Sequence, residues 1–308
     1  IMSSIFTLSI VQSALELGLI YSLVALALFL SFSILNIADL STDGCFTLGC
    51  AVGAMVTLAG HPVLALFAAM FAGVCSGYIT AFLQTKLGIE SILAGIIVNT
   101  GLYTINIAVM AGSSTVNLFN CDTLFSMAKD KIGGSFSKII VAVVIVILIA
   151  IFLAWFLGTR LGLSIRATGN NPDMVKASSI NPGFMITVGL CVANALTGLS
   201  GALLAQYQKS CDINLGTGMV TIALASLIIG ESLIGKGSVL RRIFGVVLGS
   251  CLYRFIVAIA LRLNVPAEAL KLVSAIIVAV AIALPYKKKQ VAFEKQKSKE
   301  KKKRREGK

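Results

Sequence analysis

The feature that most limits the fold of this sequence is its long apolar runs, separated by glycine, proline, asparagine and charged residues. The clearest run, residues 139–158, reads IIVAVVIVILIAIFLAWFLG and contains no charged side chain. Charged residues make up 13% of the 308-residue chain, whereas they make up about 25% of soluble domains. A water-soluble core cannot bury this much apolar surface, because part of every fold must face water. Most of the chain is therefore expected to face lipid.

Nine apolar runs are candidate membrane spans, because a spanning helix needs about 20 mostly apolar residues. They lie near residues 8–35, 44–60, 62–84, 90–111, 138–158, 183–204, 217–234, 242–263 and 266–285. Lysine and arginine are enriched in cytoplasmic loops, which places the loop 160–182 and the end of the chain inside and the loop 112–137 outside. The sequence thus predicts an all-α polytopic membrane protein of about nine transmembrane helices, with an external N-terminus and a cytoplasmic C-terminus.

The formal net charge of +13 is concentrated at the end of the chain. Residues 287–308 contain twelve lysine or arginine residues and three glutamates. We therefore divide the chain into a transmembrane domain, residues 1–286, and a basic disordered cytoplasmic tail, residues 287–308. The tail is expected to anchor the chain beside the membrane lipid at the inner face. Binding to anionic lipid or nucleic acid is the alternative, but no nucleic-acid partner is predicted.

Two polar interruptions indicate a weak internal repeat. In the segments 22–56 and 195–229, an apolar helix is followed by a polar break and then by a second helix. The break residues are Asn36, Asp39, Asp43 and Gly44 in the first segment, and Asp212, Asn214 and Gly216 in the second. An odd number of spans separates the two breaks, so the halves would have inverted topology, which is typical of transporters. Irregular backbone at membrane depth needs protein or a water-filled cavity around it, so we expect the solute pathway near these breaks. The alternative to an internal repeat is a coincidence between two polar turns.

The internal loop, residues 160–182, contains a predicted short helix. Asn170 or Asn171 can cap this helix, and Pro172 can occupy its first position. Asp173 lies in the first turn, and the helix is expected to run for about eight residues. Such a helix is too short to be stable alone in water. It is interpreted as a rigid element presented to a partner, with an ordinary solvated connector as the alternative.

The same loop resembles the coupling segment of ATP-binding-cassette importer permeases of the branched-chain amino acid and ribose type. That segment carries R-A-x-G-x-N, which is matched here by Arg166, Ala167, Gly169 and Asn171, whereas Ser179 replaces the usual glycine. Residues 23–49 and 195–233 resemble more closely the tryptophan/tyrosine-type permeases, and the resemblance covers nearly all of residues 8–285. It implies that the ATPase is contacted by Arg166, Gly169, Asn170, Asn171, Pro172, Asp173, Lys176 and Ser179.

The resemblance implies a multi-pass subunit of an importer in the bacterial cell membrane, which is not itself an enzyme. It implies a homodimeric or pseudo-dimeric membrane core, two separate ATPase subunits inside that use ATP and Mg²⁺, and a substrate-binding protein outside. This chain would hold no cofactor. The solute would be an amino acid, aromatic or branched-chain, with a sugar or nucleoside as the alternative. The residues alone also leave open an ion-coupled secondary transporter and a scaffold protein without a conduit.

Three ionisable residues within the expected spans are costly to place in lipid. Glu16, Glu231 and Arg254 are interpreted as structural residues that pair with one another or extend to the interface, with a role in the pathway as the alternative. Two cysteines in expected external loops, Cys121 and Cys211, could form a disulfide. Their spacing alone does not decide whether they do.

Two other kinds of site are not expected. Residues 230–238, GESLIGKGS, lack the serine or threonine that must follow the lysine of a phosphate loop. No metal-ligand spacing occurs among the cysteines, and His61 is the only histidine. Nucleotide and metal binding by this chain are therefore not predicted.

Overall fold

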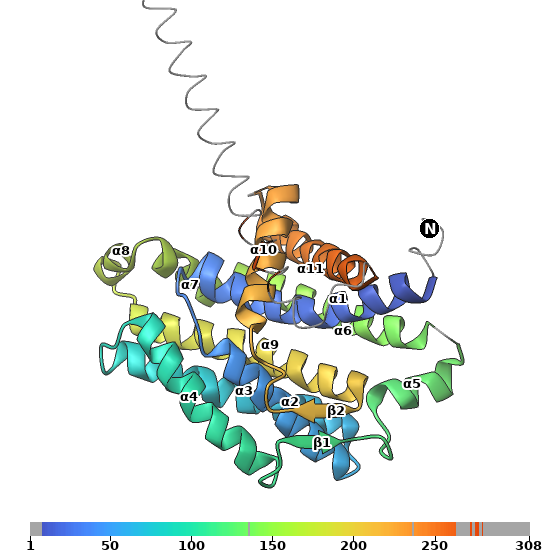
Figure 1. The fold of residues 1–308 in the computed structure, drawn as a ribbon. Helices are drawn as coiled ribbons and strands as arrows, with labels where there is room; N and C mark the ends of the chain where they lie inside the picture. Colours follow the sequence, from blue (N-terminus) through green and yellow to red (C-terminus); the bar gives the residue numbers. More distant parts are fainter. Residues whose placement is uncertain are drawn as a thin grey trace, which may run out of the picture.

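The computed structural model describes residues 8–262, except Ser135 and Lys236, together with Leu272, Ala275, Ile276 and Ala279. The described residues form eleven α-helices, one π-helix and two three-residue strands (Figure 1). The longer elements are α1 (Leu8–Leu28), η2 (Phe29–Ile34), α2 (Thr42–Leu58), α3 (Pro62–Thr85), α4 (Ser91–Val109), α6 (Ser137–Gly158), α9 (Pro182–Gln208), α10 (Met219–Ile234) and α11 (Val239–Arg262). The shorter ones are β1 (Thr115–Asn117), α5 (Leu124–Ile132), α7 (Arg160–Asn170), α8 (Pro172–Ala177) and β2 (Ser210–Asp212).

Six helical segments are long and apolar enough to cross a membrane. They are residues 10–34, which join α1 to η2, and the helices α3, α4, α6, α9 and α11. The apolar helices α2 and α10 are shorter, at 17 and 16 residues. The expected all-helical class is confirmed apart from the two short strands, and eight of the nine expected spans correspond to apolar helices. The ninth, residues 266–285, lies outside the continuously described residues.

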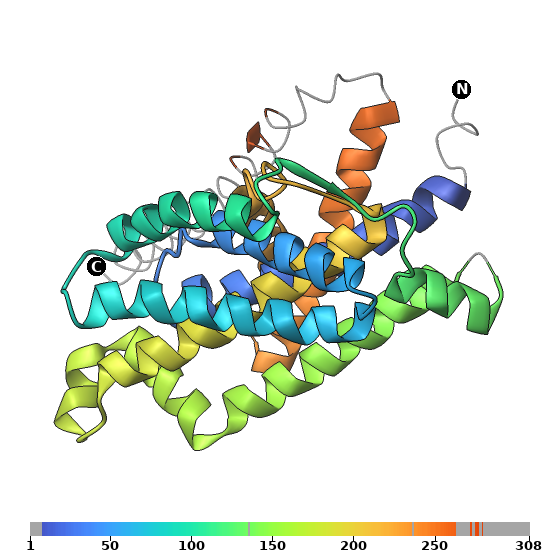
Figure 2. The same cartoon turned by 90° about the horizontal axis from the view of Figure 1, so that it is seen from below.

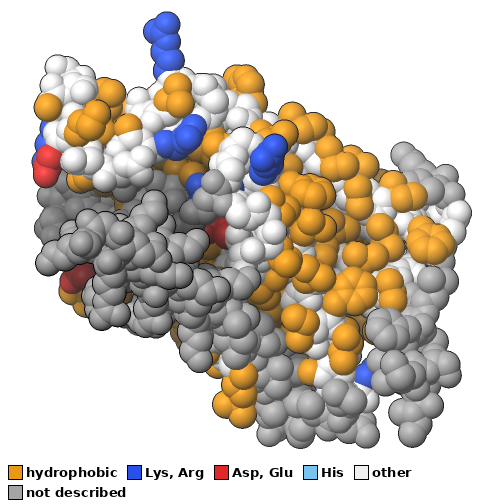
Figure 3. Space-filling model, turned by 90° about the horizontal axis from the view of Figure 1, so that it is seen from above, with side chains coloured by type: hydrophobic (Ala, Val, Ile, Leu, Met, Phe, Trp, Pro, Cys, Tyr) orange, Lys and Arg blue, Asp and Glu red, His pale blue; other side chains and the backbone are white. Residues whose placement is uncertain are grey.

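The core is formed around α9 and α1, which are buried along most of their length. In the most apolar 18-residue window, 83% of the residues are buried in both the segment 10–34 and α9. The corresponding share is 28% in α4 and 22% in α6. Because helices that expose apolar side chains all along one side need a nonpolar solvent, α4 and α6 form the outside of a bundle in lipid. Figure 3 shows a broad hydrophobic surface of this kind, with lysine and arginine side chains mainly toward one end.

Glycines allow the central helices to pack backbone against backbone. A Cβ atom added to Gly53 of α2 would lie 2.6 Å from the Ala202 Cβ of α9. One added to Gly77 of α3 would lie 2.6 Å from the Leu190 carbonyl oxygen of α9. Association of helices in lipid depends on such close packing, because there is no water to expel. The glycine- and alanine-rich sequence of α2, α3 and α9 therefore positions the centre of the bundle.

The short elements lie at opposite ends of the bundle. Helices α7 and α8 are at one end, and α5, β1, β2 and the start of α1 are at the other (Figures 1 and 2). The strands pair antiparallel, with Val116 opposite Cys211. The loop 112–137 and the second polar break therefore share one end, as the expected topology requires. Which of the two ends faces the cytoplasm stays a prediction.

Candidate solute pocket and coupling segment

The first polar break follows a π-helix at the end of the first span. The π-helix η2 ends at Ile34, and Asn36 has a left-handed backbone with φ of 58°. Asp39 is buried, and its Oδ1 accepts hydrogen bonds from the Ser41 amide at 2.9 Å and the Ser41 hydroxyl at 2.6 Å. Its Oδ2 accepts a bond of 2.9 Å from Asn194 Nδ2 on α9. Asp39 thus satisfies the local backbone and fixes the break to the central helix.

The second polar break is joined to the first through Asp43. This residue lies in the first turn of α2, and its carboxylate accepts bonds of 2.9 Å from the amides of Gly218 and Val220. These amides are at the N-terminus of α10, where backbone N–H groups have no partner within the helix. Close by, Thr47 Oγ1 accepts a 3.1 Å bond from the Gly216 amide. The N-terminus of α10 is therefore capped by a carboxylate at the N-terminus of α2.

A polar cavity of about 290 Å³ lies beside this junction. Its lining comes from α2, α4 and the segment before α10: Asp43, Gly44, Thr47, Asn99, Thr100, Tyr103, Asn106, Ile213, Asn214 and Thr217. We refer to it as the solute pocket. It brings together four of the residues expected from sequence, namely Asp43, Gly44 and Asn214 in the lining and Gly216 bonded to the lining residue Thr47. Asn36, Asp39 and Asp212 do not line it.

Asn106 gives the solute pocket an unused acceptor. Its Nδ2 donates a 3.2 Å hydrogen bond to the Gly44 carbonyl oxygen, which fixes the orientation of the amide. Its Oδ1 is buried without a hydrogen-bond partner, and the residue is only 1% exposed. A buried acceptor without a partner is destabilising by about 1–3 kcal/mol. The unpaired acceptor lies in the wall of the solute pocket, and a hydrogen-bond donor could reach it only if neighbouring side chains moved aside.

Polar side chains interrupt the apolar surface of α4 beside the solute pocket. Thr100 and Thr104 are exposed and Tyr103 is 52% exposed, whereas the other exposed side chains of this helix are apolar. Gly101, between them, has no neighbour within 4 Å of an added Cβ. Polar groups at membrane depth are accommodated where they line an aqueous cavity or contact protein. We therefore expect this stretch of α4 to face water or a further protein surface.

The strand pair holds the second break at the end of the bundle opposite α7. Thr115 is opposite Asp212 in the ladder, and Asp212 Oδ1 accepts a 2.7 Å bond from the Asn214 amide. Cys211 is buried and lies opposite Val116 in the ladder. Cys121 and Cys211 are both free thiols, so the disulfide considered from sequence is not formed. The pairing of these distant segments had no signal in the sequence.

The internal loop consists of two helices, not one. The amphipathic helix α7, capped by Thr159, was not expected from the sequence. Asn171, and not Asn170, caps α8, since its Oδ1 accepts bonds of 3.1 Å from the amides of Asp173 and Met174. Pro172 is the first residue of α8, which has six residues in place of the expected eight because it ends at Ala177. Lys176 lies in its last turn, and Ser179 follows with a left-handed φ of 61°.

Helix α7 contacts the first break directly. Gly169 packs so closely on the end of η2 that an added Cβ would overlap the Ile34 carbonyl oxygen and lie 2.9 Å from the Leu35 Cα. Arg166 lies one turn earlier on the same helix. Only eight residues separate Ile34 from Asp43. The loop is thus linked to the solute pocket through one short segment of irregular backbone.

The three ionisable candidates have partners other than one another. Glu231 forms an ion pair with Arg242 and accepts a 2.9 Å bond from the Ser33 hydroxyl. Glu16 accepts bonds from the Tyr207 hydroxyl at 2.8 Å and from Gln12 Nε2 at 3.0 Å. The Arg254 guanidinium lies 3.6 Å from the centre of the Tyr21 ring. Pairing of Glu231 with Arg254, as the sequence interpretation allowed, is therefore wrong, and no group of metal-binding side chains occurs among the described residues.

Comparisons with known proteins agree on one family. Residues 10–283 match the model of the family described as "Branched-chain amino acid transport system / permease component". The chain is 34% identical to the tyrosine transport system permease protein of Clostridioides difficile (strain R20291) over 266 residues, which cover 86% of this chain and 88% of the relative. It is 30% identical to an uncharacterized protein of Rickettsia prowazekii (strain Madrid E) over 281 residues, which cover 88% of this chain and 95% of that protein. No solved structure matches the chain.

Proposed function

Because this chain belongs to the family of permease components of branched-chain amino acid transport systems, we propose that it moves an amino acid past the solute pocket. The chain is a multi-pass membrane subunit of an ABC-type transporter and is not an enzyme. Family membership thus decides against the ion-coupled secondary transporter and the scaffold protein. The choice of solute and the role of the pocket are our proposal.

The acceptors of the solute pocket support a solute with an ammonium group. An ammonium carries one positive charge and three hydrogen-bond donors, and it has no acceptor. The pocket offers it the Asp43 carboxylate, and movement of neighbouring side chains would add the unpaired Asn106 Oδ1. The exposed Tyr103 ring can bind a cation by its face. A sugar or nucleoside would not use the negative charge, so we favour an amino acid, and the tyrosine transport protein of Clostridioides difficile favours an aromatic one.

Motion is proposed to reach the pocket from α7 and α8. In this proposal an ATPase subunit with ATP and Mg²⁺ binds the coupling residues on the α7–α8 side, which faces the cytoplasm. The contact of Gly169 with Ile34 would displace the segment 35–41 and, with it, the Asp43 cap of α10. An external substrate-binding protein would dock at the opposite end. A second copy would cover the polar part of α4 and complete the path.

The two polar breaks are proposed to be equivalent parts of inverted halves. The supporting observation is their contact, in which Asp43 of the first segment caps the helix that follows the break in the second. Each break precedes an apolar helix shorter than a full span, α2 or α10. Paired broken helices at the centre of the membrane commonly form the solute site of transporters.

Uptake by the complete complex in proteoliposomes tests the solute pocket. We expect Asn106→Ala and Asp43→Asn each to lower the maximum rate of amino-acid uptake about tenfold, or ~1.4 kcal/mol, with saturating binding protein. Ile151→Ala, at an exposed residue of the lipid-facing helix α6, is the control. Variants that assemble normally and transport at the control rate would refute the assignment of the pocket. Faster uptake of a sugar than of any amino acid would refute the solute class.

A further inference from the structure

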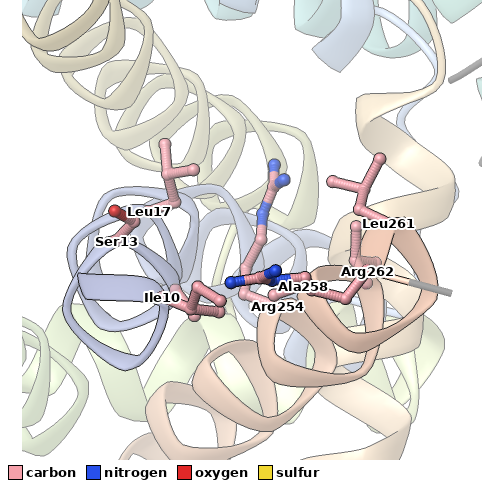
Figure 4. A pocket seen from close by; sticks show the side chains of 9 residues that line it. Ile10, Ser13, Leu17, Arg254, Ala258, Leu261 and Arg262 are labelled. Atoms are coloured by element: carbon pink, nitrogen blue, oxygen red, sulfur yellow. The ribbon is translucent and has the colours of Figure 1, made fainter. Parts of the chain in front are cut away.

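A second cavity, of about 370 Å³, lies between the first half of α1 and the second half of α11. It shares no lining residue with the solute pocket. Arg254 and Arg262 of α11 line it together with Ser13 of α1, and aliphatic side chains such as Leu17 and Leu261 form the remaining wall. Figure 4 shows the two arginines on α11 opposite the side chains of α1. The cavity thus combines positive charge with an apolar surface.

Arg254 is a membrane-helix cation without a carboxylate partner in the described part of the chain. In the described part of the chain, Glu231 forms its ion pair with Arg242 and not with Arg254. The Glu16 carboxylate on α1 accepts its hydrogen bonds from Tyr207 and Gln12 and does not line the cavity. The Arg254 guanidinium rests on the Tyr21 ring, but its Nε is buried without a hydrogen-bond partner.

An uncompensated cation is costly at membrane depth, where ionisable side chains normally have a counter-charge or reach water. The ring contact offsets part of this cost, since a desolvated cation–π contact contributes about 2 kcal/mol. The ring offers no hydrogen-bond acceptor to the buried Nε. An anion in the cavity would supply both the charge and the acceptor.

The position of the cavity favours an amphiphilic anion. Arg262 is one residue before the end of the span expected over residues 242–263, so we expect this end of the cavity to lie near the membrane interface. Arg254 lies eight residues earlier, which is about 12 Å along the helix, and its long side chain can extend toward the interface. A phosphate at the interface would meet guanidinium groups, and attached acyl chains would meet the aliphatic wall. Basic pockets between membrane helices bind phospholipid head groups by these interactions.

We propose that the cavity between α1 and α11 binds the phosphate group of an anionic phospholipid, with Arg254 as the principal cation. The guanidinium donates paired hydrogen bonds to phosphate oxygens, as arginine does in other phosphate sites. The aliphatic side chains of α1 and α11 contact the beginning of the acyl chains. This site is independent of the solute pocket, so either proposal can fail without the other.

Lipid retention by the purified complex tests this proposal. The complex is exchanged in detergent against phosphatidylglycerol, phosphatidylcholine or inorganic phosphate, and bound lipid is measured by native mass spectrometry together with the Tm. We expect phosphatidylglycerol to be retained at least tenfold more strongly than phosphatidylcholine. Arg254→Gln should remove this preference, whereas Arg254→Lys should keep part of it. Arg241→Gln, at an exposed arginine of the same helix, is the control and should bind as the wild type does.

Two results would overturn the proposal. One is equal retention of phosphatidylglycerol by the wild type and Arg254→Gln. The other is a rise in Tm with inorganic phosphate that matches the rise with phosphatidylglycerol, since this would identify a phosphate site in place of a lipid site. If Arg254→Gln does not fold, the lipid preference of the wild type and of Arg254→Lys still decides: absence of a preference in both would refute the proposal.

Discussion

The ion pair between Glu231 and Arg242 should stabilise the contact of α10, α11 and the π-helix. Arg242 Nε donates a 3.2 Å bond to Glu231 Oε1, and its Nη2 donates to both Glu231 and Ser33. The guanidinium also lies 4.8 Å from the centre of the Phe29 ring. The two charged side chains are 16% and 15% exposed, so most of their surface is shielded from solvent. Removal of one partner would therefore leave the other charge poorly solvated.

The expected magnitude follows from this partial burial. Breaking a fully buried pair by removing one partner costs about 3–5 kcal/mol, whereas an exposed pair contributes about 0–1 kcal/mol. For Arg242→Met we expect an intermediate loss of about 2 kcal/mol in the free energy of unfolding, because Ser33 still donates to Glu231. Glu231→Gln should cost about as much, since it leaves Arg242 without its counter-charge. The double variant leaves no charge behind, so it should cost no more than either single change.

Reversible unfolding in mixed detergent micelles, followed by circular dichroism, measures these changes. The double-mutant cycle should give a coupling energy of about 2 kcal/mol, within the range for residues in one network. Arg241→Met is the matched control, because Arg241 is the exposed neighbour of Arg242 and should change stability by less than about 0.5 kcal/mol. If the effects of the two single changes simply add in the double variant, the ion pair does not stabilise this junction and the reasoning is refuted.

Two further predictions concern packing and coupling. Gly53→Val places a side chain against Ala202 and should cost about 1–3 kcal/mol by overpacking. Gly158→Val, where no neighbour lies within 4 Å, should assemble normally, and equal thermal stability of the two variants would contradict the packing argument. Replacing Pro172 and Asp173 with glycine removes the fixed start of α8, so uptake by the complex should be lost while ATPase activity persists. Unchanged solute-stimulated hydrolysis and uptake in this variant would contradict a coupling role.

The spans could be predicted because they depend on local composition. Lipid requires about 20 apolar residues in succession, and this signal is present in each segment without knowledge of the others. Helix α7 was missed for the same reason, since its sequence RLGLSIRATGN is amphipathic and resembles a polar loop. Its helical form depends on the Thr159 cap and on packing of its inner side, including Ile165, in the core. Expectations based on apolar runs do not detect such a helix.

The contacts of the charged residues could not be predicted, because they depend on tertiary structure. Glu16 and Tyr207 are 191 positions apart, and Ser33 and Glu231 are 198 apart. Arg242 is close in sequence to Glu231, but they meet only because the chain reverses direction between α10 and α11 after Gly235, whose φ of 79° favours glycine. Asn106 was missed altogether, since one asparagine in an apolar helix does not reveal whether its amide will be satisfied. The polar breaks, by contrast, could be located because lipid excludes irregular backbone.

The contact between the two breaks has a mechanical consequence for transport. The unpaired amides at a helix N-terminus carry partial positive charge, and both α2 and α10 begin near the Asp43 carboxylate. Hydrogen bonds to a charged group are worth about 1.5–3 kcal/mol each, so loss of the two bonds to Gly218 and Val220 would require a compensating interaction. A solute ammonium that binds this carboxylate would compete with these amides, because all of them donate to the same two oxygens. Solute binding would thus weaken the hold of α2 on α10, and we expect the segment 35–41 to convey that change to the contact of α7 with Ile34.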